Sequence, residues 1–202
     1  MIDKICTFLT KKIQKEMPDI DEEKAEVINY GLQNIIGEIP KIILLFIIAW
    51  ILGVFKEVLF MFIVLSPYRG ASGGFHLKTH IGCIIGTNIF YCGVAFLSKS
   101  LILSEEIKYL MVLGVWVFGM IMIKLYAPAD TENVPILSKK ERKKKKILSY
   151  LTFTIGMIAS LVIKDNVVSN ILIFGNLLQT INITKIAYKL TKNKYGYEVY
   201  GT

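Results

Sequence analysis

Two long runs of uncharged apolar residues constrain this chain more than any other feature of its sequence. Ile42–Phe55 reads IILLFIIAWILGVF and Ile81–Leu97 reads IGCIIGTNIFYCGVAFL, and neither run contains a charged residue. A helix needs about 20 mostly apolar residues to cross the hydrocarbon core of a bilayer, with about 17 as a lower limit. A soluble domain would instead disperse its apolar residues with the period of its helices or strands. These blocks therefore indicate an integral membrane protein.

Apolar segments of this kind recur along the chain, and six can be drawn. They run about 35–55, 57–67, 80–98, 106–126, 147–164 and 166–186. The second is short, so it either spans by borrowing flanking residues or re-enters on the side from which it came. We predict an all-α polytopic membrane protein with about six transmembrane or partly re-entrant helices.

Lysine and arginine are distributed unequally between alternate loops. They gather before the first span, between the second and third, in the run 139–146, and after the sixth, whereas the other loops carry little positive charge. Because cytoplasmic loops carry an excess of cations, this pattern predicts a multi-pass protein of the cell membrane with both termini, the 67–79 loop and the 127–146 loop in the cytoplasm. The net charge of +8 then reflects orientation and anionic lipid rather than nucleic acid.

The first 34 residues form a separate, amphipathic region. Ile5, Phe8, Leu9 and Ile13 follow the spacing of one helix face among lysines and acids. We interpret this region as an interfacial helix on the cytoplasmic leaflet, with a helix packed on the cytoplasmic ends of the spans as an equal alternative. The expected organisation is thus an interfacial region (1–34), a membrane-embedded domain (35–186) and a cytoplasmic C-terminal tail (187–202).

The basic run KKERKKKK is interpreted first as a solvated loop on the cytoplasmic side. The alternative is a docking patch for an acidic peptide or for anionic headgroups.

The stretch SPYRGASGGFHLKTHIGC, residues 66–83, interrupts the apolar pattern and contains both histidines of the chain. Ionisable groups in such irregular segments are candidates for function. A thiol nucleophile at Cys83 would need a base to raise its thiolate fraction. His80 shares a helix face with Cys83, whereas His76 is seven residues away, about 10.5 Å along a helix. Spacing alone therefore slightly favours His80 or leaves the choice open.

His76 could act as the base only if the helix starts after it and the preceding loop folds back. Gly73 and Gly74 would permit such a fold, because glycine reaches backbone conformations closed to other residues.

Other interpretations of these residues are simpler. Cys83 could be a small hydrophobe in an apolar helix, and the two histidines with Cys83 could bind a metal, although no second Cys/His pair is present to complete the site. The three cysteines, Cys6, Cys83 and Cys92, have no CxxC spacing and do not suggest a disulfide framework. We expect neither a metal nor a cofactor.

The pattern Arg69-x-x-x-Gly73-Gly74-x-His76-x₆-Cys83 resembles the accessory gene regulator B family of quorum-sensing peptidases. The chain length, the order of segments and the loop YAPADTENVPI before the basic run resemble that family as well. The resemblance implies that Cys83 is the nucleophile and His76 its base, and His80 lies outside the pattern. Arg69 would organise the loop or bind an acidic substrate group.

Asp130 and Glu132 in the YAPADTENVPI loop are weaker candidates for orienting His76. A solvated turn is the plainer interpretation of both residues.

By this resemblance, the function is a membrane-embedded cysteine endopeptidase. It would cleave a precursor peptide through an acyl thioester on Cys83 and so lead to a cyclic thiolactone autoinducing peptide. The expected partners are that precursor, with an amphipathic N-terminal helix and an acidic C-terminal tail, membrane lipids, and optionally a second copy in a homodimer. The alternative is a peptide transporter, for which interrupted helices are also typical, but the glycine-rich break occurs only once.

Overall fold

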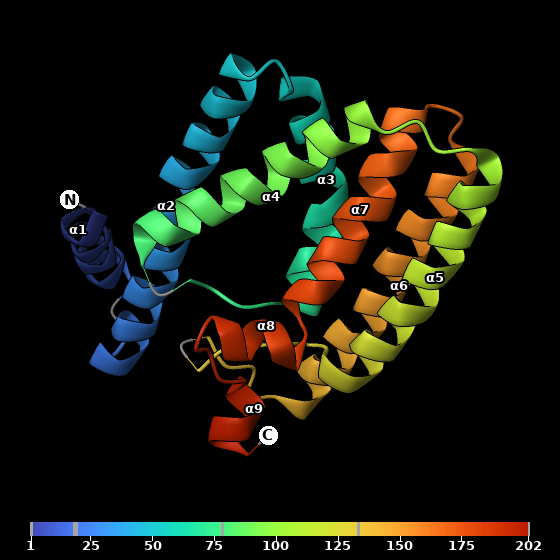
Figure 1. Cartoon of the computed structure of the whole chain (residues 1–202). Helices are drawn as coiled ribbons and strands as arrows, with labels where there is room; N and C mark the ends of the chain where they lie inside the picture. The colour runs from blue at the N-terminus through green and yellow to red at the C-terminus, as the bar shows by residue number, and fades with distance from the viewer. Residues whose placement is uncertain (1, 18–19, 78, 133, 202) are drawn as a thin grey trace. The chain divides into compact units, whose positions relative to one another are not determined.

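The computed structural model describes residues 2–17, 20–77, 79–132 and 134–201, and these are almost entirely helical (Figure 1). The described part contains nine helices and three isolated β-bridges. The helices are α1 (Ile2–Glu16), α2 (Glu22–Ile51), α3 (Phe55–Ser72), α4 (His80–Ser100), α5 (Glu105–Tyr126), α6 (Lys139–Val162), α7 (Asn166–Asn182), α8 (Lys185–Leu190) and α9 (Gly196–Tyr200). The prediction of an all-α membrane protein is confirmed.

The chain divides into two compact units, residues 1–48 and 49–202. In the first unit, the Thr10 hydroxyl of α1 lies 3.3 Å from Asn29 Oδ1 of α2, and Cys6 is buried. Phe8, in contrast, remains 67% exposed. The helix predicted from the N-terminal periodicity is therefore present. Part of its apolar face is not covered by other residues of the first unit. Its location at the membrane interface stays a prediction.

Three helices in the described part of the chain are long and apolar enough to cross a membrane. They are Ile81–Ser100, Glu105–Tyr126 and Lys139–Val162. At 1.5 Å per residue, the 22 residues of α5 extend roughly 33 Å, which matches the hydrocarbon thickness. The six segments expected from the sequence correspond to α2–α7, but the number of spans remains a prediction.

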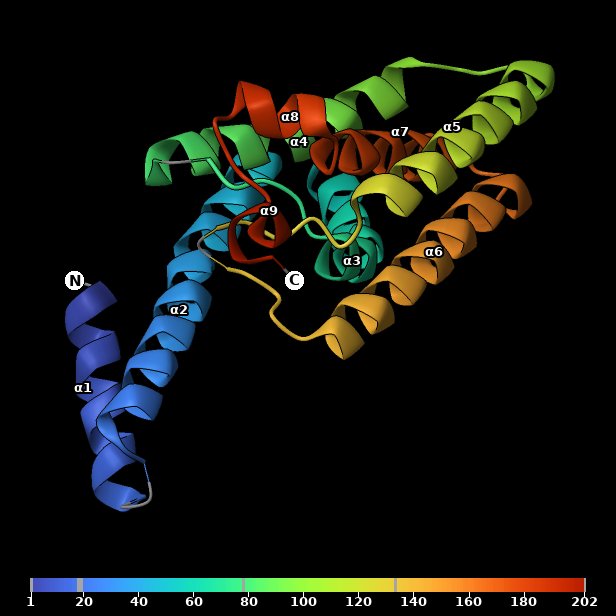
Figure 2. The same ribbon diagram turned by 90° about the horizontal axis from the view of Figure 1, so that it is seen from below.

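Helix α7 is the centre of the second unit. It contacts α3, α4, α5 and α6, and every residue from Ser169 to Asn176 is buried. Figures 1 and 2 show α7 beside α5 and α6. Its polar side chains bind neighbouring helices: Asn170 donates to the Leu101 carbonyl at 2.8 Å, and Thr180 lies 2.9 Å from the Tyr68 hydroxyl. Such hydrogen bonds hold helices together where apolar burial cannot discriminate between protein and lipid.

Helix α3 is longer than the predicted 57–67 segment, because it continues through Pro67 to Ser72. Proline removes one hydrogen bond from a helix interior and normally kinks or ends it. Here Tyr68, Ala71 and Ser72 beyond the proline are buried, and α3 packs on α6 and α7. This packing outweighs the lost bond, so the helix ends at Ser72 instead of Pro67.

The interpretation of the run 139–146 as a loop is wrong, since these residues form the first two turns of α6. Ser138 caps the helix by accepting a hydrogen bond from the Glu141 amide. Lysine and arginine are good helix formers, so a cap and a following apolar segment suffice to extend the helix. Most side chains of the run remain exposed, as expected for a solvated segment.

Three segments far apart in sequence meet at one end of the second unit. Gly74 of the α3–α4 loop bonds Ala129, Asn193 bonds the His76 carbonyl, and Gly196 bonds the Asp130 carbonyl. Lys99 and Glu57, 3.1 Å apart, join α3 and α4 elsewhere. These contacts bring together parts of the α3–α4 loop, the 127–138 loop and the C-terminal segment, and we expect these parts to lie on one side of the membrane.

We expect that side to be the cytoplasm, because it carries the 139–146 cations. A reporter enzyme that is active only in the cytoplasm should be active when it is fused after residue 146 and inactive when it is fused in the 101–104 connection. A result that places the 139–146 run outside the cell would contradict the predicted orientation.

Candidate functional site

The loop after α3 begins with two glycines in unusual backbone conformations. Gly73 has φ +73° and Gly74 has φ +135°, both in the region that favours glycine. Gly73 forms an isolated parallel bridge with Ala129: the Gly74 amide donates to the Ala129 carbonyl at 2.8 Å, and the Ala129 amide to the Ser72 carbonyl at 2.7 Å. A Cβ on Gly73 would overlap that same carbonyl group. Both the turn and the close approach therefore require glycine.

Arg69 holds this loop by its carbonyl groups. Its guanidinium donates to the Phe75 carbonyl at 3.0 Å and to the Gly73 carbonyl at 3.3 Å. Gln179 of α7 donates to the same Gly73 carbonyl at 2.9 Å. A Cβ on Gly74 would overlap the Arg69 guanidinium. The contacts of Arg69 are thus those of a loop-organising residue, one of the two roles considered from the sequence.

His76 lies in the extended segment between the two helices, and its side chain is exposed. Helix α4 begins only at His80, where the Thr79 hydroxyl accepts a hydrogen bond from the Gly82 amide. His76 and Cys83 are therefore not two turns apart on one helix. The assignment of His76 as the base requires this late helix start.

Cys83 lies in the first turn of α4, with its amide bonded to the Thr79 carbonyl at 3.0 Å. Its side chain is partly exposed, whereas Cys6 and Cys92 are buried. Of the three thiols, Cys83 thus has the access that a nucleophile needs.

His80 is the first residue of α4, but its side chain lies outside the described part of the structure. Among the described residues, no group of three His, Cys, Asp or Glu side chains is placed to hold a metal ion.

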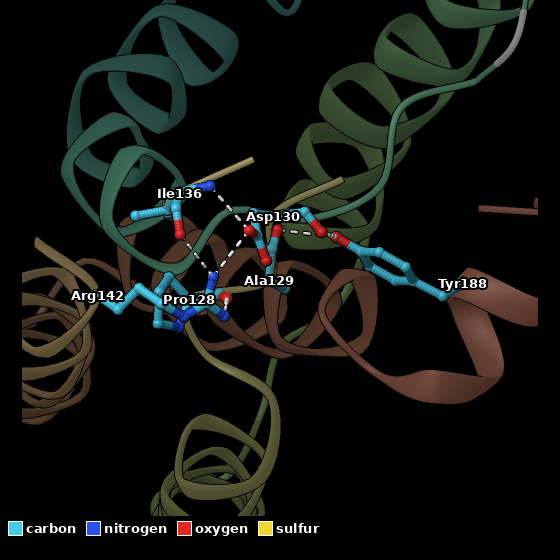
Figure 3. A network of polar contacts seen from close by, with 6 residues as sticks. All are labelled: Pro128, Ala129, Asp130, Ile136, Arg142 and Tyr188. Atoms are coloured by element: carbon cyan, nitrogen blue, oxygen red, sulfur yellow. Dashed lines mark hydrogen bonds and ion pairs between the residues drawn. The ribbon is translucent and has the colours of Figure 1, made fainter. Parts of the chain in front are cut away.

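The 127–136 loop is fixed by a buried ion pair (Figure 3). Arg142 lies 2.8 Å from the Asp130 carboxylate and also donates to the carbonyls of Pro128 and Ile136. The Ile136 amide donates to Asp130 as well, at 2.9 Å. The Asp130 side chain is only 1% exposed, so its interpretation as a solvated turn is wrong. Instead, Asp130 closes the loop onto the first turn of α6.

A cavity of about 520 Å³ opens between the loop after α3 and the 127–138 loop. Gly73, Gly74 and His76 line one side, and Pro128–Thr131 and Val134–Ser138 line the other. Cys83 is not among its lining residues.

A second cavity, of about 450 Å³, shares Gly70, Ala71, Ser138, Glu141 and Lys145 with the first. Lys140 and Lys144 line it in addition. The two cavities therefore share part of their lining, and the second cavity lies against the basic first turns of α6.

The C-terminal segment completes this region, although the sequence analysis treated it as a tail. Asn193 donates to the His76 carbonyl at 2.9 Å, and the Tyr188 hydroxyl donates to the Ala129 carbonyl at 2.8 Å (Figure 3). The segment KIAYKLTKNKYGYEVY, residues 185–200, offered a signal for this in its four tyrosines, because so many aromatic residues are unusual in a solvated tail.

Comparisons with known proteins identify the family. The sequence model for accessory gene regulator B matches residues 6–183. An AgrB-like protein of Clostridium acetobutylicum is 26% identical over 96% of this chain and 91% of its own length. Related AgrB-like proteins of Listeria innocua (28% identical, 93% and 91% covered) and Clostridium perfringens strain SM101 (31%, 77% and 73%) also match. No solved structure matches this chain. The chain belongs to the accessory gene regulator B family, which takes part in the processing of quorum-sensing peptides.

Proposed function

We propose that this protein is a cysteine endopeptidase that cleaves a membrane-bound signalling-peptide precursor, with Cys83 as nucleophile and His76 as base. One observation carries the proposal: a capped helix start places the partly exposed Cys83 in the first turn of α4, so that His76 in the preceding loop is not two turns away on the same helix. The loop is fixed by Arg69 and by the bridge to Ala129. Such fixing limits the positions that a base can take, which favours catalysis.

The reaction begins with proton transfer from the Cys83 thiol to His76. The thiolate attacks the carbonyl carbon of the scissile peptide bond and forms a tetrahedral intermediate. When the intermediate collapses, the C–N bond breaks and protonated His76 returns its proton to the leaving amine. The C-terminal part of the precursor departs with a new amino terminus, and its N-terminal part remains as a thioester on Cys83.

The second step transfers the acyl group to a cysteine within the precursor. That thiol gives its proton to His76, attacks the thioester carbonyl and displaces the Cys83 thiolate, which is reprotonated. One thioester replaces another, so the cyclic thiolactone forms without a further energy source. The closed peptide and the free enzyme are the products.

The substrate proposed here is a peptide with an acidic C-terminal part. Lys140, Lys144 and Lys145 line the second cavity, which shares five lining residues with the cavity beside His76. An acidic segment bound along these lysines would place the bond that precedes it close to His76. The proposal assigns partner binding by the basic run, considered from the sequence, to these three lysines.

Charge reversal tests this direction of binding. The double variant Lys140→Glu/Lys144→Glu should raise the KM for precursor cleavage about tenfold, with kcat changed less, because two attractions become repulsions. Lys139→Glu/Lys143→Glu is the matched control, since these exposed residues have the same spacing and are outside both cavity linings. Equal effects of the two double variants would show that only the net charge of the run matters.

The whole proposal is tested by reconstituting the protein in vesicles with a candidate precursor. Mass analysis should detect the released C-terminal fragment and a precursor-derived acyl group on Cys83. A peptide transporter, the alternative function, would move the peptide across the vesicle membrane without changing its mass. Transport of an uncleaved precursor, with no acyl-enzyme, would overturn the peptidase proposal.

A further inference from the structure

We propose that the C-terminal segment, residues 184–200, is a clamp that positions the catalytic loop, and that Asn193 is its positioning residue for His76. The inference rests on the proposed function and deepens it. The family model matches this chain only as far as residue 183, so the segment lies beyond the matched region. Its contacts nevertheless reach both sides of the cavity beside His76.

Asn193 makes the direct contact between the clamp and the catalytic loop. Its side-chain amide donates to the His76 carbonyl at 2.9 Å. The same amide lies 2.9 Å from the Thr191 hydroxyl, and the Asn193 backbone amide donates to the Tyr188 carbonyl at 2.9 Å. Asn193 is therefore held by its own turn, and it can transmit that fixed position to the backbone of His76.

A second contact joins the clamp to the same loop through one shared carbonyl. The Ala129 carbonyl accepts hydrogen bonds from the Gly74 amide and from the Tyr188 hydroxyl, each at 2.8 Å. Burial raises the pKa of the Tyr188 phenol, so its hydroxyl stays protonated at neutral pH and can donate. Gly74, Ala129 and Tyr188 thus connect three segments at one point.

Stacked tyrosines hold the clamp itself. Tyr195 is buried, its ring centroid lies 3.9 Å from that of Tyr188, and its hydroxyl donates to the Ile183 carbonyl at 2.9 Å. Tyr197 continues the stack, and the Arg142 guanidinium lies 5.1 Å from its ring centroid. Burial of a hydroxyl group is costly unless the group is hydrogen-bonded, as the hydroxyls of Tyr188 and Tyr195 are.

Gly196 brings the clamp into close contact with Asp130 of the 127–138 loop. Its amide donates to the Asp130 carbonyl at 3.3 Å, and a Cβ at this position would overlap the Asp130 carboxylate. Figure 2 shows α9 beside the connection between α5 and α6. The clamp therefore contacts the 127–138 loop, whose Asp130 lines the other side of the cavity and pairs with Arg142.

A clamp that positions His76 predicts a defect in turnover rather than in substrate binding. Asn193→Ala and Asn193→Asp both remove the donor to the His76 carbonyl. They should lower kcat about tenfold, with KM within about twofold of the wild type, because a displaced base loses alignment in the transition state. The control Lys194→Ala changes the exposed neighbouring side chain and should keep wild-type kinetics.

Alkylation of Cys83 gives a second readout that needs no precursor. With Cys6→Ser and Cys92→Ser as background, iodoacetamide can report Cys83 alone. The alkylation rate should be higher in the otherwise wild-type protein than in the same background with His76→Ala, because the proposed base takes the proton of the Cys83 thiol. Asn193→Ala and Asn193→Asp should lower this rate at least threefold, and Tyr188→Phe should act in the same direction.

The outcomes separate the clamp from the proposed function. An alkylation rate that His76→Ala leaves unchanged would contradict the His76–Cys83 pair itself. A rate that His76→Ala lowers but the Asn193 variants leave unchanged, together with wild-type kcat in the Asn193 variants, would overturn the clamp only. Thermal unfolding measures how much of each Asn193 variant is folded. If the losses of kcat and of alkylation in both variants only matched a loss of folded protein, the segment would have a purely structural role, and the proposal would be overturned.

Discussion

Replacing Cys83 with serine or alanine is expected to abolish precursor cleavage, with a loss of at least about 10³-fold. The alanine variant has no nucleophile, and a serine hydroxyl at this site would not ionise as readily as a thiol at neutral pH. Both variants should still bind the precursor, because Cys83 is absent from the lining of the cavities. Cleavage is measured by mass analysis of the precursor in vesicles, and binding by capture of the uncleaved peptide.

The other two cysteines are internal controls for this experiment. Cys6 is buried in the first unit, and Cys92 is buried nine residues beyond Cys83 in α4. Cys6→Ser and Cys92→Ser should keep most of the cleavage activity. Full activity of either Cys83 variant would refute the mechanism, since no acyl thioester could then form at that position.

Replacing His76 with alanine should lower kcat by about 10²–10⁴-fold, the range typical for removal of a general base. His80→Ala should lose far less. The prediction depends on the start of α4 at His80, which leaves His76 in a loop that Arg69 and Asn193 hold by its carbonyl groups. Added imidazole should partly restore the His76→Ala variant, because a small free base can replace the missing side chain.

The reverse result is equally informative. If His80→Ala lost more activity than His76→Ala, the pair His80–Cys83, three residues apart at the start of α4, would be the catalytic dyad. The family pattern would then have been carried over incorrectly at this position. Circular dichroism of both purified variants checks that the helical fold is intact.

The sequence alone determined where the chain becomes helical in an apolar environment. The predicted segments 80–98 and 106–126 correspond to His80–Ser100 and Glu105–Tyr126. Segment length and hydropathy are local properties of the chain, so they can be assessed without the fold. The interruption of the apolar pattern at residues 66–83 likewise pointed to the glycine-rich loop and to Cys83 as candidates for chemistry.

Local patterns failed where distant packing decided the outcome. The apolar segment predicted from the sequence ended at residue 67, yet burial of Tyr68 and Ala71 against other helices extends α3 to Ser72. The charge of the basic run indicated only its side of the membrane, so the run was predicted to be a loop. Its helix-forming residues and the cap at Ser138 make it the start of α6 instead.

Only the tertiary structure decided how the candidate site is assembled. Gly73 meets Ala129, Asp130 pairs with Arg142, and Asn193 reaches His76 across 117 positions of sequence. Each of these contacts exchanges hydrogen bonds with water for bonds between segments that become neighbours only when α3, α5, α6 and α7 have packed. Hydropathy and spacing describe one segment at a time, so the backbone partners of the His76 loop could not be obtained from them.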